Sequence, residues 1–283
     1  MTLTPYQRVL LWSGVLLLAS GAFHVGVWLT TGAGSLDGAT TWRKPIEFGV
    51  SGGLTAVTLV WVLSRVRPNA IAGWTVALTV ACFIPETALI ALQQWRGVPS
   101  HFNDASSLDS LVFSMMGIFI GIVIVGIAVL TAWVFVAPRA GPATTLAIRA
   151  AMVFLLIGQG LGGVLLANGF ANTGPIGNAS ILGAAGQLKV PHALAIHGLQ
   201  VMVVLALLLE RTGLSLKARQ RAVILCAVGY ADLLSTSIAQ TLGGRAPLDL
   251  DPVAVLLTLF ALLLVVWGYI PVIGAARSFR VRT

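Results

Sequence analysis

Long apolar runs recur along the whole chain, separated by short polar segments. A helix needs about 20 residues to cross the hydrocarbon core of a bilayer. Runs of this length cover roughly 9–30, 43–64, 70–94, 109–137, 149–170, 191–210, 221–241 and 252–274. No polar segment is long enough for a separate soluble domain. The pattern predicts an all-α, polytopic transmembrane bundle of about eight spans, with residues 1–283 in a single integral membrane domain.

Composition supports this prediction and excludes other classes of protein. Hydrophobic residues make up 57% of the chain and charged residues 9%, whereas a soluble domain carries about 25% charged residues. The net charge of +8 lies in short loops between apolar runs, where it sets topology, so a nucleic-acid partner is not expected. Cys82 and Cys226 both fall inside predicted spans and are expected to pack there without forming a disulfide.

The positive charges predict the orientation of the chain. Of the 17 Lys and Arg residues, one set of loops and the two ends hold the majority: Arg8, Arg65, Arg67, Arg139, Arg149, Arg211, Lys217, Arg219, Arg221, Arg277, Arg280 and Arg282. The opposite loops hold the rest: Arg43, Lys44, Arg96, Lys189 and Arg245. The positive-inside rule therefore predicts that both termini are cytoplasmic, in a multi-pass protein of the inner membrane. We call the predicted extracytoplasmic end of each span its outer end.

A weak internal repeat divides the chain into halves 1–140 and 141–283. The second predicted span enters at Lys44-Pro45 with Gly52 seven residues after the proline, and the sixth enters at Val190-Pro191 with Gly198 seven residues after it. The third span contains Glu86 and the seventh contains Asp232. Four spans followed by four would place the halves in the same orientation, as a 4+4 parallel repeat.

Glycine spacing predicts where helices pack closely. Three pairs are four residues apart, and all three are expected at helix–helix contacts: Gly49 and Gly53, Gly117 and Gly121, and Gly158 and Gly162. The segment 171–190 is long for a connection within a helical bundle. It is read as a flexible tether or as a lid over an external site.

The four histidines all fall in the outer third of the predicted bundle. His24 lies inside the first span, His101 in an external loop, and His192 and His197 in the first turns of the sixth span. His192 and His197 are about 140° apart around a helix, so they are poorly placed to ligate one ion together. Gln200 falls angularly between them. His24 and His197 have similar predicted depth on different helices, which is the arrangement that bis-histidine haem ligation requires.

Charged residues near this end complete the set of candidates. Glu86 lies inside the third span, where an ionisable residue is costly and therefore a candidate for function. Asp232 opens a polar stripe in the seventh span, which is read as a proton path or as a helix contact. Arg43 and Lys44 open the second span and are read as an interfacial anchor or as a site for an anionic group.

Three functions fit these residues. The first is a redox or electron-transfer protein that holds haem b or a transition metal (zinc, copper or iron) near the extracytoplasmic face and uses a quinone or a lipid as substrate. In this interpretation the cofactor contacts are His24, His197, Arg43, Lys44 and Gln200, and the metal ligands are His24, His192, His197 and Glu86. The sequence alone does not decide whether the protein is an enzyme, nor its oligomeric state.

The other two functions use overlapping residues. A membrane metalloenzyme acting on a lipid would hold zinc through the same ligands, with Glu86, His101 and Asp104 as the catalytic groups. A proton-coupled transporter built as a tandem repeat would carry protons on Glu86 and Asp232.

Three patches of the sequence resemble an uncharacterised family of bacterial multi-span membrane proteins. They are Trp42-Arg43-Lys44-Pro45, the Arg-Gly-x-x-Ser-His-Phe-Asn segment at 96–103, and the His-x4-His-x2-Gln segment at 192–200. The resemblance implies a shared membrane fold and marks the same three patches, without implying an activity. The sequence departs from the family pattern at Glu47 and Gln187, where the family has a basic and an acidic residue.

Overall fold

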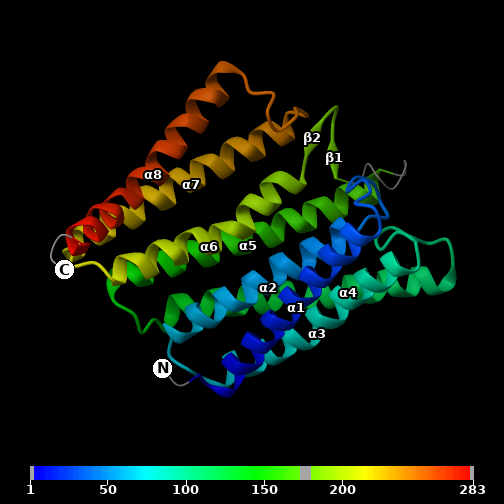
Figure 1. Cartoon of the computed structure of the whole chain (residues 1–283), viewed down its shortest axis with the longest axis horizontal. Helices are drawn as coiled ribbons and strands as arrows, with labels where there is room; N and C mark the ends of the chain where they lie inside the picture. Colours follow the sequence, from blue (N-terminus) through cyan, green and yellow to red (C-terminus); the bar gives the residue numbers. More distant parts are fainter. Residues whose placement is uncertain (1–2, 173–179, 281–283) are drawn as a thin grey trace. The chain divides into compact units, whose positions relative to one another are not determined.

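The computed structural model describes residues 3–172 and 180–280, and within them the chain forms eight α-helices and one short hairpin (Figure 1). The helices are α1 (Pro5–Thr30), α2 (Arg43–Ser64), α3 (Ala70–Trp95), α4 (Ser107–Val136), α5 (Pro142–Ala171), α6 (Lys189–Glu210), α7 (Leu216–Leu242) and α8 (Pro252–Arg280). All eight are long and apolar enough to cross a membrane. The predicted all-α, multi-pass bundle is therefore confirmed.

Side-chain caps fix three helix starts at the predicted cytoplasmic side. Thr4 forms a capping box with Gln7 ahead of Pro5, and Asn69 and Ser215 each accept a bond from a backbone N–H in the first turn of α3 and α7. The prediction that Arg149 lies in a loop is wrong, because α5 begins at Pro142. Arg149 donates a hydrogen bond to the carbonyl of Phe135 (2.8 Å), which accommodates its charge inside the helix.

The chain divides into two compact units. Unit 1 comprises Met1–Trp133 with Gly169–Ala179, and unit 2 comprises Val134–Asn168 with Ser180–Thr283. Each unit contains one pair of helices packed along their length: α1 with α2 in unit 1, and α7 with α8 in unit 2. Within each pair the two helices lie side by side (Figure 1).

Glycines allow α1 and α2 to approach at backbone distance. A Cβ built on Gly49 would lie 2.7 Å from the backbone nitrogen of Gly21, and one on Gly53 would lie 2.8 Å from the carbonyl oxygen of Gly14. The close contact predicted for the pair Gly49 and Gly53 is confirmed. In unit 2, Gly229 and Gly268 give α7 and α8 the same close contact, because a Cβ on either would meet a backbone oxygen of the partner helix within 3 Å.

The other two predicted glycine pairs have different outcomes. Gly158 contacts α6, because its Cβ would lie 3.0 Å from the backbone nitrogen of Ile196, and Gly162 leaves room for the ring of His192. The prediction for Gly117 and Gly121 is wrong, because no described atom of another helix lies within 4 Å of a Cβ built on either. In α4 the close contact is made instead by Gly126, against the Thr79 side chain of α3.

Two helices of unit 1, α2 and α3, correspond to α6 and α7 of unit 2 with the same offset in sequence. The first residues of α2 and α6, Arg43 and Lys189, are 146 positions apart, and so are their last residues, Ser64 and Glu210. The two helices therefore have the same length and the same register. α3 and α7 also begin 146 positions apart, at Ala70 and Leu216. Identical or similar residues occupy the same offset elsewhere: Pro45 and Pro191, Gly52 and Gly198, Glu86 and Asp232, Gln94 and Gln240, and Gly97 and Gly243.

The described part of the 171–190 segment is not a loose tether. Ile181–Leu182 (β1) pairs antiparallel with Gly186–Gln187 (β2). The hairpin is fixed to the C-terminal end of α7 and the turn after it, since Ala185 N–H donates to the carbonyl of Gly244 (2.8 Å) and Gly186 lies against the carbonyl of Thr241. Residues 173–179, the rest of the predicted tether or lid, lie outside the described residues.

Candidate functional site

His24 is buried in α1 and both of its ring nitrogens have partners in unit 1. Nδ1 lies 2.8 Å from the carbonyl oxygen of Ser20, and the Trp95 indole N–H donates to Nε2 at 3.3 Å. A carbonyl can only accept and an indole N–H can only donate, so the proton of the ring sits on Nδ1. Use of Nε2 as a haem or metal ligand would require the Trp95 bond to break. The predicted pairing of His24 with His197 at a haem stays a prediction.

Arg43 forms ion pairs with two carboxylates of the protein itself. Its guanidinium lies 3.7 Å from Asp37 and 3.6 Å from Glu47. Trp42, the residue before it, stacks near His24 (ring centroids 5.9 Å apart) and meets Trp95 edge-on at 5.0 Å. These contacts support the interpretation of the Trp42-Arg43-Lys44-Pro45 patch as an interfacial anchor.

Lys44 belongs to a hydrogen-bonded chain that the sequence did not reveal. Its ammonium donates to Ser100 Oγ at 3.3 Å, and Ser100 Oγ lies 2.9 Å from Nδ1 of His101. Because Lys44 can only donate, the Ser100 hydroxyl proton is available to His101. Ser100, at the centre of this Lys44–Ser100–His101 chain, is buried. Asp104, the predicted acid–base partner, is exposed in the same loop.

His101 should remain neutral throughout the physiological pH range. Burial, with a smaller contribution from the nearby Lys44 charge, lowers its pKa from 6.5 to about 3. The unfolded chain then binds more protons than the folded chain between these two pKa values. The stability that neutral His101 contributes is therefore complete above pH 6.5 and decreases as the pH falls toward 3. In an NMR titration of histidine side chains, His101 should show no protonation shift between pH 8 and 5, and a midpoint in the usual histidine range would contradict this placement.

Glu86 is the most isolated acidic group of unit 1. It is 2% exposed in the middle of α3, and its Oε2 is buried with no hydrogen-bond partner among the described residues. Asp109, by contrast, accepts bonds from Gln93 (3.1 Å), Arg96 (2.7 Å) and Ser106 (2.7 Å). Asp109 therefore ties the outer ends of α3 and α4 together, whereas Glu86 has no such structural role.

Unit 2 holds the remaining predicted residues. The ring of His192 is oriented by α5, because its Nδ1 lies 2.8 Å from the carbonyl oxygen of Gly158. His197 and Gln200 follow on α6 and are half-buried. Asp232 on α7 is half-buried. Its Oδ2, like Thr236 Oγ1 one turn further on, is buried and has no hydrogen-bond partner in the part of the chain that the structure describes.

A metal centre finds no support among the described residues. No group of three or more His, Cys, Asp or Glu side chains gathers in residues 3–172 and 180–280 in a way that could hold an ion. The predicted ligand set of His24, His192, His197 and Glu86 draws on both units and stays a prediction. Cys82 and Cys226 are free and buried, as predicted.

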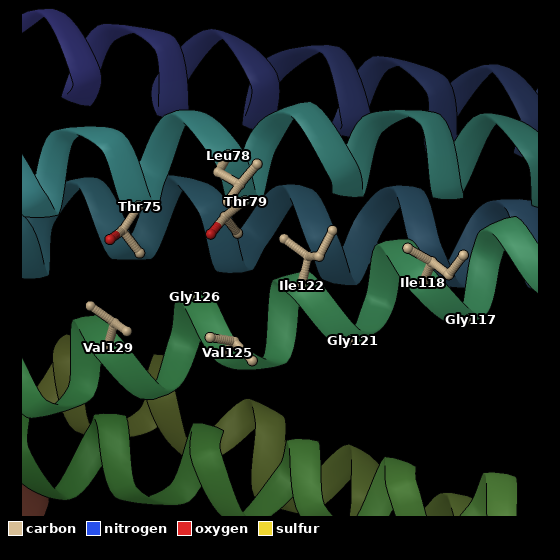
Figure 2. A pocket seen from close by; sticks show the side chains of 10 residues that line it. All are labelled: Thr75, Leu78, Thr79, Gly117, Ile118, Gly121, Ile122, Val125, Gly126 and Val129. Atoms are coloured by element: carbon tan, nitrogen blue, oxygen red, sulfur yellow. The ribbon is translucent and has the colours of Figure 1, made fainter.

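A groove of about 390 Å³ runs between α3 and α4 in unit 1 (Figure 2). Its lining is apolar apart from Thr75 and Thr79, which point from α3 toward α4. Gly117 and Gly121 form part of the opposite wall, which explains why a side chain there would meet nothing. None of the predicted site residues lines this groove. Its mostly apolar lining is compatible with contact to hydrocarbon.

Comparisons with models of protein families, with curated proteins and with solved structures found no match to this chain.

Proposed function

We propose that the protein is a proton-coupled transporter in which Glu86 and Asp232 carry the protons. The observation that carries this proposal is their equivalence: they lie 146 positions apart, the same offset that relates α2 to α6 and α3 to α7. Glu86 is buried and Asp232 is half-buried, each in a membrane-spanning helix, and each has one buried carboxyl oxygen with no hydrogen-bond partner among the described residues.

The other seven acidic residues are placed differently. Asp37 and Glu47 pair with Arg43, Asp109 pairs with Arg96, and Asp249 and Asp251 pair with Arg245; Glu210 accepts a bond from Thr144, and Asp104 is exposed. A carboxyl fixed by a cation is held in its charged form and cannot easily exchange a proton. Of the nine acids in the chain, Glu86 and Asp232 are therefore best suited to bind and release protons.

Tandem repeats support transport over other functions of a membrane helix bundle. Repeated halves give many secondary transporters two related bodies whose relative movement exposes a central site to one side and then the other. Intramembrane carboxyls in such proteins commonly form proton relays. We place the protein in the inner membrane with cytoplasmic termini, on the strength of the Lys and Arg distribution.

The test is proton movement across a reconstituted membrane. Proteoliposomes carrying an internal pH dye, with a potassium diffusion potential imposed, would receive a filtered small-molecule cell extract. The wild-type protein should show extract-dependent proton uptake, whereas Glu86→Gln and Asp232→Asn should each lose it. Glu47→Gln, which removes a carboxyl at the outer end of α2, should retain it. Absence of extract-dependent uptake in the wild type, or equal uptake in all variants, would refute the proposal.

The redox alternative rests on one observation in unit 2. With Nδ1 of His192 donating to the Gly158 carbonyl, Nε2 presents a lone pair, which is how a metal-bound histidine is commonly oriented. The purified protein would then show a haem absorption band or stoichiometric metal that His192→Ala removes.

A further inference from the structure

The outer half of unit 1 contains an apolar layer between two polar levels. We use the term apolar layer for Ile90, Val112 and Met116, which are 0%, 4% and 2% exposed, together with Phe48 and Leu89, which pack against them. These side chains come from α2, α3 and α4, the helices whose outer ends carry the Lys44–Ser100–His101 chain and the Arg96–Asp109 pair.

The layer contacts the polar chain on its outer side. The ring of Phe48 lies 6.3 Å from that of His101, and Phe113, next to Val112 in α4, lies 6.1 Å from it. Lys44 is one turn before Phe48 on α2, so the polar chain sits directly above the layer.

Glu86 lies on the inner side of the layer. It is four residues before Ile90 on α3, which places the two side chains on the same face about 6 Å apart along the helix axis. Its partnerless oxygen is therefore separated from the polar outer chain by the thickness of the apolar layer. Gln93, on the outer side of the layer, is hydrogen-bonded to Asp109 and Arg96.

The attachments of α4 to α3 indicate how the layer could open. On the inner side of the layer, the groove lined by Gly117 and Gly121 separates α4 from α3 (Figure 2). α4 is held to α3 by the Arg96–Asp109 pair at the outer end and by the Thr79–Gly126 contact further in. Between these two attachments the packing of Ile90 against Val112 and Met116 joins the two helices, so opening of the layer would separate side chains.

We infer that the apolar layer is the outer gate of the proton site at Glu86, closed in this structure. This inference rests on the proposed transport function and adds how access to the proton site is controlled. The gate keeps water and ions from Glu86 until α4 moves away from α3. Hydrophobic constrictions in channels gate in this way, by excluding water from a narrow apolar passage.

A native cysteine tests the gate without any knowledge of the solute. Cys82 is buried one turn inside Glu86 on α3, and Cys226→Ser leaves it as the single thiol of the chain. In right-side-out membrane vesicles, a membrane-impermeant methanethiosulfonate should modify Cys82 slowly. Ile90→Ala and Met116→Ala should each raise the rate about tenfold or more, because removing buried side chains thins the layer and eases local opening.

The control is Val62→Ala, which removes equally buried atoms from the inner half of α2. It should leave the rate of Cys82 modification unchanged. Rates that do not respond to either layer variant, or that rise equally with Val62→Ala, would overturn the gate. The outcome is distinct from that of the transport test, because thiol modification does not depend on proton uptake by Glu86.

Discussion

Gly49→Leu is expected to prevent folding of unit 1, with a loss of more than about 4 kcal/mol of stability. A Cβ at this position would lie 2.7 Å from the backbone nitrogen of Gly21, 2.8 Å from its Cα and 2.9 Å from the carbonyl oxygen of Leu17. All three are backbone or backbone-bound atoms, so no side-chain rotation relieves the clash and the two helices must separate. The measurement is the yield of monodisperse protein after detergent extraction.

Gly26→Leu is the matched control, because Gly26 lies on α1, the partner helix of this contact, and a Cβ there meets no described atom within 4 Å. It should be extracted at the wild-type level. If Gly49→Leu were also extracted at that level, with an unchanged melting temperature, the close contact of α1 and α2 would not exist as described.

The positions of the spans could be predicted because hydrocarbon imposes a simple requirement. Each helix must satisfy its own backbone and present about 20 apolar residues to lipid. The predicted range 43–64 coincides with α2, and 191–210 differs from α6 by two residues. The prediction failed at the start of α5, because a charge was taken to mark a loop. Arg149 is tolerated inside the helix since its side chain reaches the Phe135 carbonyl and ring.

The candidate site was harder to predict because its contacts depend on side-chain orientation. Spacing identified His24 but could not show that Trp95, 71 residues away, donates to it. Ser100 was seen only as part of a motif, yet it joins Lys44 to His101. Glycine spacing likewise identified Gly117 and Gly121 without showing that their face of α4 lines a groove. Glu86 and Asp232 could be identified from the sequence as candidate functional residues, because a carboxylic acid within an apolar run is rare.

Two buried polar residues of α3 should respond in opposite directions to the same substitution. Glu86→Leu should raise the stability of the protein by about 1–3 kcal/mol, because it removes a buried carboxyl whose Oε2 has no partner. Gln93→Leu should lower it by about 1–3 kcal/mol, because the Gln93 side chain donates to Asp109 at 3.1 Å and accepts from Arg96. The measurement is the thermal melting temperature of the purified protein in detergent.

The opposite signs distinguish a functional carboxyl from a structural one. Both side chains are buried, at 2% and 0% exposure, on the same helix, so a difference in exposure does not explain the contrast. A protein retains a destabilising group where function requires it, and the gain in stability from Glu86→Leu should therefore come with loss of proton uptake. A lower melting temperature for Glu86→Leu would show that the carboxyl stabilises the fold, and its role as a proton carrier would then lose its main physical support.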